Sequence, residues 1–427
     1  MERILILGGG ASGLVAAISA AETAPRGVKV TLLEANPRVG KKLLATGTGR
    51  CTLDNTAAAP ERYFTSEPQV LSQMLGTMSN PLDWFHAHGL LTRADSEGRV
   101  YPYSNQAADV LNLLLRWLEQ LNVEVLTGQR VTGLTPKDGG FAVTTEADRF
   151  FARSVICALG GQAGPQFGTS GSGSALAKGM GFRVLPEYPC LVGLQCDKPR
   201  PAGLAGIRVK AAVTLTDGGT FIAREEGEVQ FTEQGLSGIV IMQLSNFLKP
   251  KGGLRRPILH MDLFPAYDRD SLTDLFQHRV RLLYGADGTD FMTGLVHKRI
   301  GAAVWKAAGL GELSRKVSSL SAAELAALAG TFGDWQFGGL TSLGWQQAQT
   351  TGGGMALSQL DGESFMAADV PGLYFVGETL DAAGICGGFN LHWAFGSGIT
   401  AGRHAAARLS QPQKNSPHRP KQRWEQK

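Results

Sequence analysis

The sequence predicts an α/β fold with a doubly wound parallel sheet, and three features near its N-terminus carry this prediction. The apolar run Ile4–Leu7 is typical of a parallel strand that is buried on both faces. It leads directly into the glycine pattern Gly8-x-Gly10-x-x-Gly13 and into an alanine-rich helix from Ala11 to about Thr23. A second strand, Val28–Leu33, ends at Glu34, at the distance typical of one βαβ unit.

The glycine turn indicates a dinucleotide site. Gly8 permits a tight turn, Gly10 leaves room for a pyrophosphate, and Gly13 lets the helix pack closely on the sheet. Free N–H groups at the start of the helix, around Ala11 and Ser12, favour a bound anion, and the helix dipole adds to this preference. These features predict a bound dinucleotide, and they leave FAD and NAD as alternatives.

The predicted site continues at the end of the second strand and in the loop after it. Glu34, followed by Ala35, stands where a carboxylate binds ribose hydroxyls and repels a 2′-phosphate. The loop 36–51 is basic at first and then rich in glycine. It is either a flexible surface loop or, since it follows the ribose-binding acid, a segment that lies against the pyrophosphate. We favour the second interpretation and predict cofactor contacts for Lys41, Lys42, Thr48, Gly49, Arg50 and Cys51.

Two further strands are expected to reach the same cofactor. One buried run ends at Gly160 and Gly161, and a second ends at Gly377 and Glu378. Ligands of doubly wound sheets bind at the carboxyl ends of the strands, where Glu378 can accept a hydrogen bond from a ribityl hydroxyl. A helix rich in small residues follows, and its N-terminus can stabilise negative charge on a reduced ring. The remaining predicted contacts come from the start of this helix and from an earlier meander strand, namely Gly388, Phe389, Asn390, Leu391 and Val131.

Length and composition are those of an ordinary globular protein with a large core, since 43% of the 427 residues are hydrophobic and 18% are charged. The net charge of +4 comes from residues 410–427, which hold five Lys or Arg and one Glu, so the rest of the chain is neutral. A neutral body gives no reason to expect nucleic acid or a membrane surface as a partner. The tail is predicted to be disordered rather than a basic arm that binds a partner.

The cysteines and the N-terminus indicate where the protein works. No CxxC pair and no Cys/His cluster with zinc spacing occurs, so no metal site is predicted and a reducing compartment is expected. The chain starts with a strand rather than a basic leader, and no apolar run approaches membrane length. We therefore expect a soluble cytoplasmic protein. The sequence leaves its oligomeric state, monomer or dimer, undetermined.

Strand and helix patterns divide the body of the chain into two domains. Residues 1–187 and 341–409 are predicted to form one discontinuous domain that binds the cofactor. Residues 188–340 show a different pattern from the cofactor-binding segments. Short strands separated by Gly and Pro come first, and helical patterns follow between about 270 and 330. We predict that they form an inserted β-rich and helical domain, which holds the substrate or covers the site.

Four stretches of the sequence resemble the BaiN/RdsA-like family of NAD(P)/FAD-dependent oxidoreductases, also described as aminoacetone-oxidase-family FAD-binding flavoproteins. They are the N-terminal fingerprint with Glu34, the loop 40–51, the segment 227–238 and the C-terminal motifs within 351–391. The resemblance covers residues 1 to about 408. It implies FAD bound in a glutathione-reductase-like, doubly wound domain, with the insert placed over the flavin.

This resemblance leads us to expect an enzyme, an FAD-dependent oxidoreductase that transfers a hydride between the flavin and a small organic substrate or NAD(P)H. The alternative is a flavin-binding redox sensor or electron-transfer protein without a dedicated substrate. A tRNA-modifying flavoprotein is disfavoured by the neutral body. No second GxGxxG marks a separate nicotinamide domain, so either NAD(P)H docks transiently or the substrate itself supplies the electrons.

Residues next to the expected flavin depart from the resembled family, and the substrate therefore stays open. Thr48 interrupts a run of glycines, and Phe389 and His392 stand where the family usually has tyrosine and glutamine. His392 is predicted to be a general acid or proton relay, or else a capping or solvent-facing histidine. Cys51 and Cys386 lie within the flavin-lining motifs, where they either form a thioether with the flavin or, as is more usual for buried cysteines, pack inertly.

Overall fold

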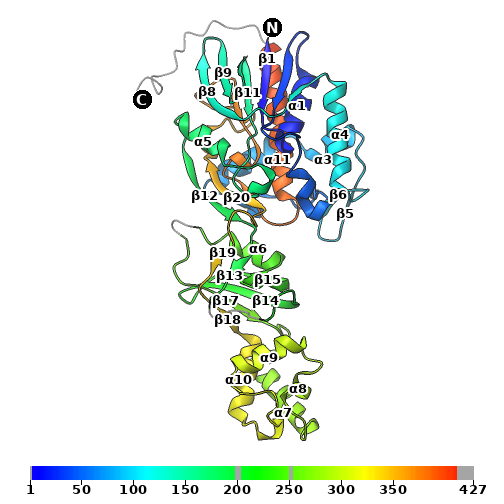
Figure 1. The fold of residues 1–427 in the computed structure, drawn as a ribbon, viewed down its shortest axis with the longest axis vertical. Coiled ribbons are helices and arrows are strands. Elements are labelled where there is room, and N and C mark those ends of the chain that lie inside the picture. The colour runs from blue at the N-terminus through cyan, green and yellow to red at the C-terminus, as the bar shows by residue number, and fades with distance from the viewer. Residues whose placement is uncertain (1, 198–202, 250–252, 411–427) are drawn as a thin grey trace. The chain divides into compact units, whose positions relative to one another are not determined.

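The structure is a computed structural model, shown in Figure 1, and it describes residues 2–197, 203–249 and 253–410. The segment 410–427, for which the sequence predicts disorder, lies outside the described residues except for Ser410, the last residue of the final helix. Across the described ranges, no helix combines the length and the apolar character that crossing a membrane requires.

Contacts between residues divide the chain into two units. The first consists of Met1–Cys190 together with Ala348–Lys427, and the second consists of Leu191–Gln347. Each unit has a hydrophobic core of its own. The second unit extends beyond position 340, because the short strand β19 (Thr341–Ser342) still pairs with a strand of the second unit.

A five-stranded parallel sheet forms the centre of the first unit. In the order of the sheet, its strands are β21 (Leu373–Phe375), β11 (Ser154–Cys157), β1 (Arg3–Leu7), β2 (Lys29–Leu33) and β7 (Glu124–Leu126). All neighbouring strands pair in parallel. The apolar residues Ile4–Leu7 of the central strand are fully buried, as expected for a strand that is covered on both faces. The predicted α/β fold with a parallel sheet is confirmed.

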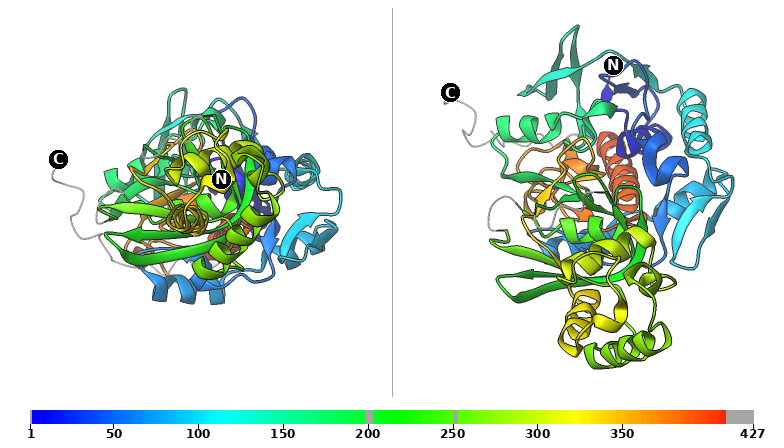
Figure 2. Two further views of the ribbon diagram at one scale, coloured as in Figure 1. Left: turned by 90° about the horizontal axis from the view of Figure 1, so that it is seen from below. Right: turned by 60° about the horizontal axis from the view of Figure 1, so that its bottom comes forward.

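Two helices of the first unit pack closely on each other, α1 (Ala11–Thr23) and α11 (Phe389–Ser410), as Figures 1 and 2 show. The close approach depends on glycine in α11. A Cβ atom added at Gly398 would overlap the carbonyl oxygen of Ser12, and one added at Gly402 would overlap that of Ala16. Helix packing therefore explains the small residues that follow the C-terminal motif.

Shorter elements complete the first unit. The meander consists of β8 (Val131–Lys137), β9 (Gly140–Thr145) and β10 (Arg149–Ala152), and β12 (Val184–Cys190) pairs with β20 (Thr350–Met355). Two small sheets contain β3 (Asp54–Asn55), β6 (Arg99–Pro102) and β5 (Thr92–Ala94), and β4 (Tyr63–Phe64) and β22 (Ala383–Gly384). The other helices are α2 (Pro68–Thr77), α3 (Pro81–Ala87), α4 (Ala107–Gln120) and α5 (Ser172–Gly179).

A seven-stranded antiparallel sheet forms the centre of the second unit. Its order is β18 (Trp335–Phe337), β17 (Pro257–Asp262), β14 (Arg208–Asp217), β15 (Thr220–Phe231), β16 (Gly235–Ser237), β13 (Leu194–Gln195) and β19. The region where the sequence predicts only short strands contains the long hairpin of β14 and β15, because both strands stay paired well beyond the turn at Gly218.

The helices of the second unit are α6 (Ile239–Ser245), α7 (Arg269–Leu282), α8 (Gly288–Met292), α9 (Lys298–Ala307) and α10 (Ala322–Gly333). The sequence pattern predicts one helix from Val296 to Ala308, but α9 starts at Lys298. It starts there because Nδ1 of His297 accepts a hydrogen bond from the backbone N–H of Arg299 and caps the helix.

Candidate functional site

The glycine turn between β1 and α1 is tightly packed at two positions and leaves space at a third. At Gly8, where φ is +105°, an added Cβ would overlap the carbonyl oxygen of Ala158, and one added at Gly13 would overlap the carbonyl oxygen of Gly8. At Gly10, no atom lies within 4 Å of an added Cβ. No side chain caps α1, so the N–H groups of its first turn stay available for an anion. The turn therefore fits a pyrophosphate.

Glu34 is fixed at the end of β2 by the glycine turn and by the residue two positions later. Its side chain is buried; Oε2 accepts the N–H of Gly9 at 2.8 Å, and Oε1 accepts the backbone and side-chain N–H groups of Asn36, each at 2.7 Å. Each carboxylate oxygen can accept more than one hydrogen bond, so the carboxylate can still bind ribose hydroxyls. No sequence pattern indicates Asn36, although asparagine side chains commonly form local hydrogen bonds in turns.

The start of β8 lies beside the same acid. The N–H of Gln129 donates to the carbonyl oxygen of Glu34 at 2.8 Å, and the N–H of Gly128 donates to that of Asn36 at 3.3 Å. Ala35 lies between the two acceptors, and Val131 follows Gln129 by two residues. The predicted residue Ala35 is thus part of this contact, and the predicted residue Val131 begins the strand that follows it.

The loop before β3 is strained where the sequence predicts contact with a ligand. Thr48 and Cys51 both have φ of +58°, a left-handed conformation that costs a residue with a Cβ atom about 1–3 kcal/mol. Such strain is concentrated at binding sites. An added Cβ at Gly49 would meet no atom within 4 Å, whereas the guanidinium of Arg50 lies 4.9 Å from the ring centre of Tyr101. Gly49 thus borders free space, whereas Arg50 stacks on the ring of Tyr101.

An ion pair joins two distant segments of the chain at this site. Nζ of Lys42 lies 2.6 Å from Oε2 of Glu378, and each side chain is less than one-quarter exposed. The other oxygen of Glu378 accepts the backbone N–H and the hydroxyl of Thr351 at 3.0 and 2.8 Å. We call Lys42, Glu378 and Thr351 the clasp, because they connect the loop after β2 with β20 and with the end of β21. The predicted residues Lys42 and Glu378 come together here.

Thr351 also fixes the loop after β11. Its Oγ1 accepts the N–H groups of Gln162 and Ala163 at 2.9 and 3.0 Å, and its side chain is fully buried. An added Cβ at Gly161 would overlap the Thr351 side chain, whereas one at Gly160 would meet no atom within 4 Å. Of these two predicted residues, Gly160 borders free space and Gly161 packs on the clasp.

A second carboxyl group lies next to the clasp. Glu187 accepts hydrogen bonds from the side-chain amide of Gln162 at 2.7 Å and from the hydroxyl of Ser174 at 2.5 Å. Burial raises the pKa of Glu187 above its ordinary value, and the nearby charge of Glu378 raises it further, although the two hydrogen bonds lower it. This carboxyl group therefore takes up a proton more readily than an exposed glutamate.

The start of α11 packs against β3 and β22. At Gly388, where φ is +107°, an added Cβ would overlap the carbonyl oxygen of Asp54. Phe389 is buried, and the amide of Asn390 forms hydrogen bonds with both the N–H and the carbonyl of Gly384, at 2.9 and 2.8 Å. These three predicted residues therefore hold the backbone in place around the start of α11.

The first turn of α11 also contains the predicted general acid, His392. Nδ1 of His392 lies 2.7 Å from Oδ1 of Asp54, and the side chains are 12% and 3% exposed. The side chain of His392 is thus mostly buried, and its Nδ1 faces Asp54 rather than solvent. The predicted residue Leu391, beside His392, is half-buried. The predicted residue Gly377 contacts the same helix farther along, where its N–H donates to Oγ of Ser397 at 3.0 Å. Asp54 is 338 residues away from His392, so no sequence spacing indicates the pair.

Cys51 remains a protonated thiol in this site. Its side chain is fully buried, and burial raises its thiol pKa to about 12, although a hydrogen bond involving Thr46 lowers it in part. A thiol that is not ionised near neutral pH is a poor nucleophile for bond formation with a flavin. We therefore expect no flavin to stay attached to Cys51 when the purified protein is precipitated with acid. A yellow pellet whose flavin maps to Cys51 would contradict this expectation.

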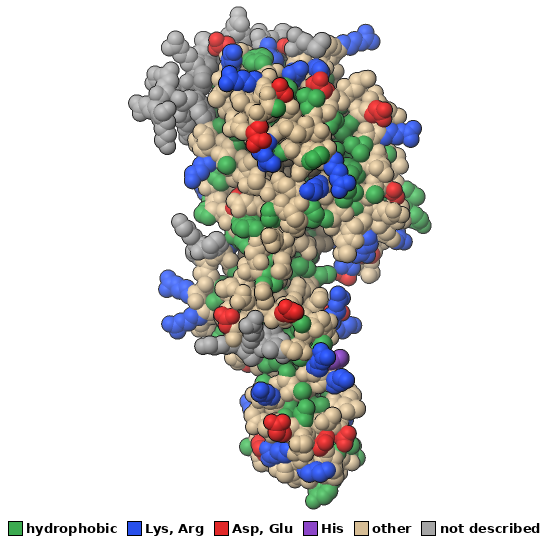
Figure 3. All heavy atoms as spheres, in the orientation of Figure 1, with side chains coloured by type: hydrophobic (Ala, Val, Ile, Leu, Met, Phe, Trp, Pro, Cys, Tyr) green, Lys and Arg blue, Asp and Glu red, His purple; other side chains and the backbone are tan. Residues whose placement is uncertain are grey.

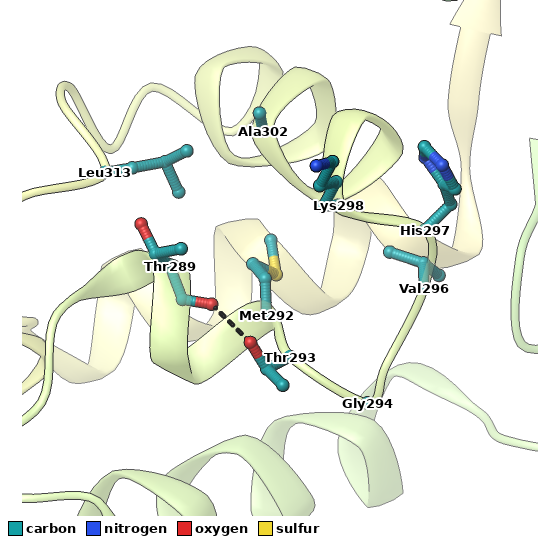
Figure 4. A pocket seen from close by; sticks show the side chains of 9 residues that line it. All are labelled: Thr289, Met292, Thr293, Gly294, Val296, His297, Lys298, Ala302 and Leu313. Atoms are coloured by element: carbon teal, nitrogen blue, oxygen red, sulfur yellow. Dashed lines mark hydrogen bonds between the residues drawn. The ribbon is translucent and has the colours of Figure 1, made fainter.

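A pocket of about 330 Å³ lies in the second unit and is lined by residues of α8, of α9 and of the connections beside them (Figure 4). The lining is mainly apolar; Met292 and Leu313 border the space, and the amine of Lys298 lies at its edge. The pocket contains no residue predicted to bind the cofactor. Within the described ranges, no group of three or more His, Cys, Asp and Glu side chains is arranged to hold a metal ion.

The parallel sheet, the uncapped helix start at the glycine turn and the fixed acid after β2 define a dinucleotide-binding protein with a Rossmann-type fold, as the sequence predicts. The surface charge of the first unit is mixed: on the face that Figure 3 shows, Lys and Arg side chains lie among Asp and Glu side chains. The chain belongs to the HI0933-like family, because the model of the HI0933-like protein Rossmann domain matches residues 2–404. The resemblance to BaiN/RdsA-like proteins is thereby confirmed.

A curated relative supports this assignment to a family. The chain is 35% identical to the 3-dehydro-bile acid delta(4,6)-reductase of Clostridium scindens, over 96% of this chain and 100% of that protein. It is 28% identical to the ribosomal RNA dihydrouridine synthase of Escherichia coli, over 93% and 96% of the two chains. It is also similar to a flavocytochrome c3 fumarate reductase of known structure, with 15% identity, a TM-score of 0.46, and coverage of 96% of this chain and 79% of that one.

Proposed function

We propose that the chain uses FAD to transfer a hydride from NAD(P)H to a small organic molecule. The observation that carries the proposal is the free space beside Gly10, which adjoins the uncapped start of α1 and the carboxylate of Glu34. These groups would hold the pyrophosphate and a ribose of FAD. FAD, when bound, supplies a ring that accepts a hydride from one molecule and gives it to another.

The chain's own residues would bind and orient this cofactor. Gly49 and Gly160 border free space and would let the cofactor approach the backbone. The clasp would fix the segments on either side of the cofactor, since it connects the loop after β2 with β20 and with the end of β21. The start of α11 would place its N-terminal dipole toward negative charge on the ring.

We infer that the substrate contains a carbon–carbon double bond conjugated to a carbonyl group. Two kinds of relative support this class. The name of one describes the reduction of delta(4,6) double bonds in a 3-dehydro-bile acid, and the name of the other describes the formation of dihydrouridine from uridine in ribosomal RNA. Both substrates combine a double bond with a neighbouring carbonyl, although one is a small molecule and the other is RNA. The higher identity to the bile acid reductase and the neutral body of the chain favour a small molecule.

An anaerobic absorbance titration tests this function. We expect NADH or NADPH to bleach the flavin band near about 450 nm quickly, and subsequent addition of 2-cyclohexen-1-one to restore it. Slow bleaching with one equivalent and no reoxidation would instead favour a redox sensor. Reoxidation by ribosomal RNA alone would favour an RNA substrate. Bleaching by an amine or a hydroxy acid, with no response to either nicotinamide, would show that the substrate itself is the electron donor.

A further inference from the structure

His392 and Asp54 form a buried polar pair beside the start of α11. Oδ1 of Asp54 accepts two groups at once, Nδ1 of His392 at 2.7 Å and the N–H of Asn55 at 2.6 Å. An ionised carboxylate can only accept hydrogen bonds, so we assign the hydrogen between the two side chains to the imidazole. Nδ1 of His392 therefore carries a proton, and Asp54 is the carboxylate that fixes the ring.

This arrangement leaves the other ring nitrogen available. Among the described residues, Nε2 of His392 has no hydrogen-bond partner, and the side chain retains 12% exposure. A histidine whose Nδ1–H is held by a buried carboxylate presents Nε2 in one fixed direction, where it can release or accept a proton. The pair therefore resembles a general acid with its orienting carboxylate rather than a structural ion pair at the surface.

Other polar groups nearby are already engaged and do not compete for this role. The hydroxyl of Tyr63 donates to the carbonyl oxygen of Phe389 at 3.0 Å, and burial, together with the charge of Asp54, raises the pKa of Tyr63 above its ordinary value. The guanidinium of Arg99 is paired with Asp95 and Glu97, at 2.7 and 2.8 Å.

We propose that His392 is the proton donor of the reduction and that Asp54 is its positioning residue. This inference rests on the proposed function. Saturation of a conjugated double bond needs one hydride and one proton: the hydride adds to the carbon farther from the carbonyl, and the other carbon then takes up a proton. The imidazolium of His392 would give that proton from Nε2 and would become neutral, still bound to Asp54 through Nδ1–H. Solvent would then return the proton.

Nitrogen-15 NMR of the FAD-loaded, histidine-labelled full chain tests the pair without any substrate. Nδ1 of His88 and of His260 also lie within 2.7 Å of an acceptor oxygen, so several deshielded Nδ1–H signals are expected in the wild-type protein. We expect one of them to disappear in His392→Gln, which assigns it to His392, and the same signal to disappear in Asp54→Asn. His404→Gln provides a matched control, because it makes the same substitution at an exposed position of the same helix. If no deshielded signal is lost in His392→Gln, or if the signal assigned to His392 persists in Asp54→Asn, the assignment of Asp54 is overturned.

Rapid mixing of the reduced enzyme with 2-cyclohexen-1-one tests the proton transfer itself. His392→Gln should slow this step about 100-fold or more, the usual contribution of a general acid, while reduction by NADPH changes far less. Asp54→Asn should slow the same step by a smaller factor, and His404→Gln should react as the wild type does. If the wild type is reoxidised and His392→Gln matches its rate, the inference fails and the proposed function stands. If the wild type is not reoxidised by the enone, the proposed function fails.

Discussion

A Gly13→Ala chain is expected to lose about 3 kcal/mol of folding free energy and to purify without flavin, because the added methyl group has no space. Its Cβ would overlap the carbonyl oxygen of Gly8 and would lie 3.3 Å from Cβ of Ala158. Backbone atoms of the fingerprint turn cannot move aside without separating α1 from β1. Urea unfolding would measure the stability, and absorbance near about 450 nm would measure the flavin content.

Gly10→Ala is the matched control, since it adds the same methyl group three residues earlier. Gly10 has φ of −82°, which alanine adopts without strain, and no atom lies within 4 Å of an added Cβ. We therefore expect the apoprotein to unfold at the same urea concentration as the wild type. FAD should bind at least tenfold more weakly, because the methyl group would occupy the space proposed for the pyrophosphate. Undiminished flavin binding by Gly10→Ala would show that the pyrophosphate lies elsewhere.

Thr351→Val is expected to destabilise the protein by about 3 kcal/mol, although the two side chains have nearly the same shape. The hydroxyl of Thr351 accepts the N–H groups of Gln162 and Ala163 and donates to Glu378. Valine would leave the N–H groups of Gln162 and Ala163 without this acceptor, and an unsatisfied buried donor costs about 1–3 kcal/mol. Thermal or urea unfolding of the apoprotein would measure the loss.

Thr132→Val serves as the control for this second substitution. Thr132 is exposed on β8, and its hydroxyl makes a 3.3 Å hydrogen bond with the carbonyl oxygen of Thr144. Valine suits a strand, so the stability should change by less than about 0.5 kcal/mol. If Thr351→Val proved as mild as Thr132→Val, Thr351 would not be essential for holding the loop after β11.

Local patterns in the sequence predict the parts of the site that are formed by short segments. The buried strand at Ile4–Leu7, the tight turn at Gly8 and the close helix contact at Gly13 each depend on residues within one βαβ unit. The start of α1 follows from the same pattern, because it begins directly after Gly10. Such features depend on backbone geometry and on burial, which residue type and spacing express directly.

Partners from distant segments could not be predicted in this way. Thr351 binds Glu378 and the loop after β11, and its identity as a buried acceptor depends on how β20 packs. Asp54 lies in a strand of two residues, which is too short for any periodic pattern. Its pairing with His392 arises because α11 starts next to β3, where Gly388 has no room for a side chain.

The sequence by itself determined the fold class, the family and the dinucleotide-type site, because a glycine turn between a buried strand and a helix is specified by neighbouring residues. Only the tertiary structure decided how the site is completed. It joined Lys42 to Glu378 and His392 to Asp54, pairs that are more than 300 residues apart in each case. Hydrogen bonds and ion pairs of this kind depend on distance in space, and the packing of the whole first unit sets that distance.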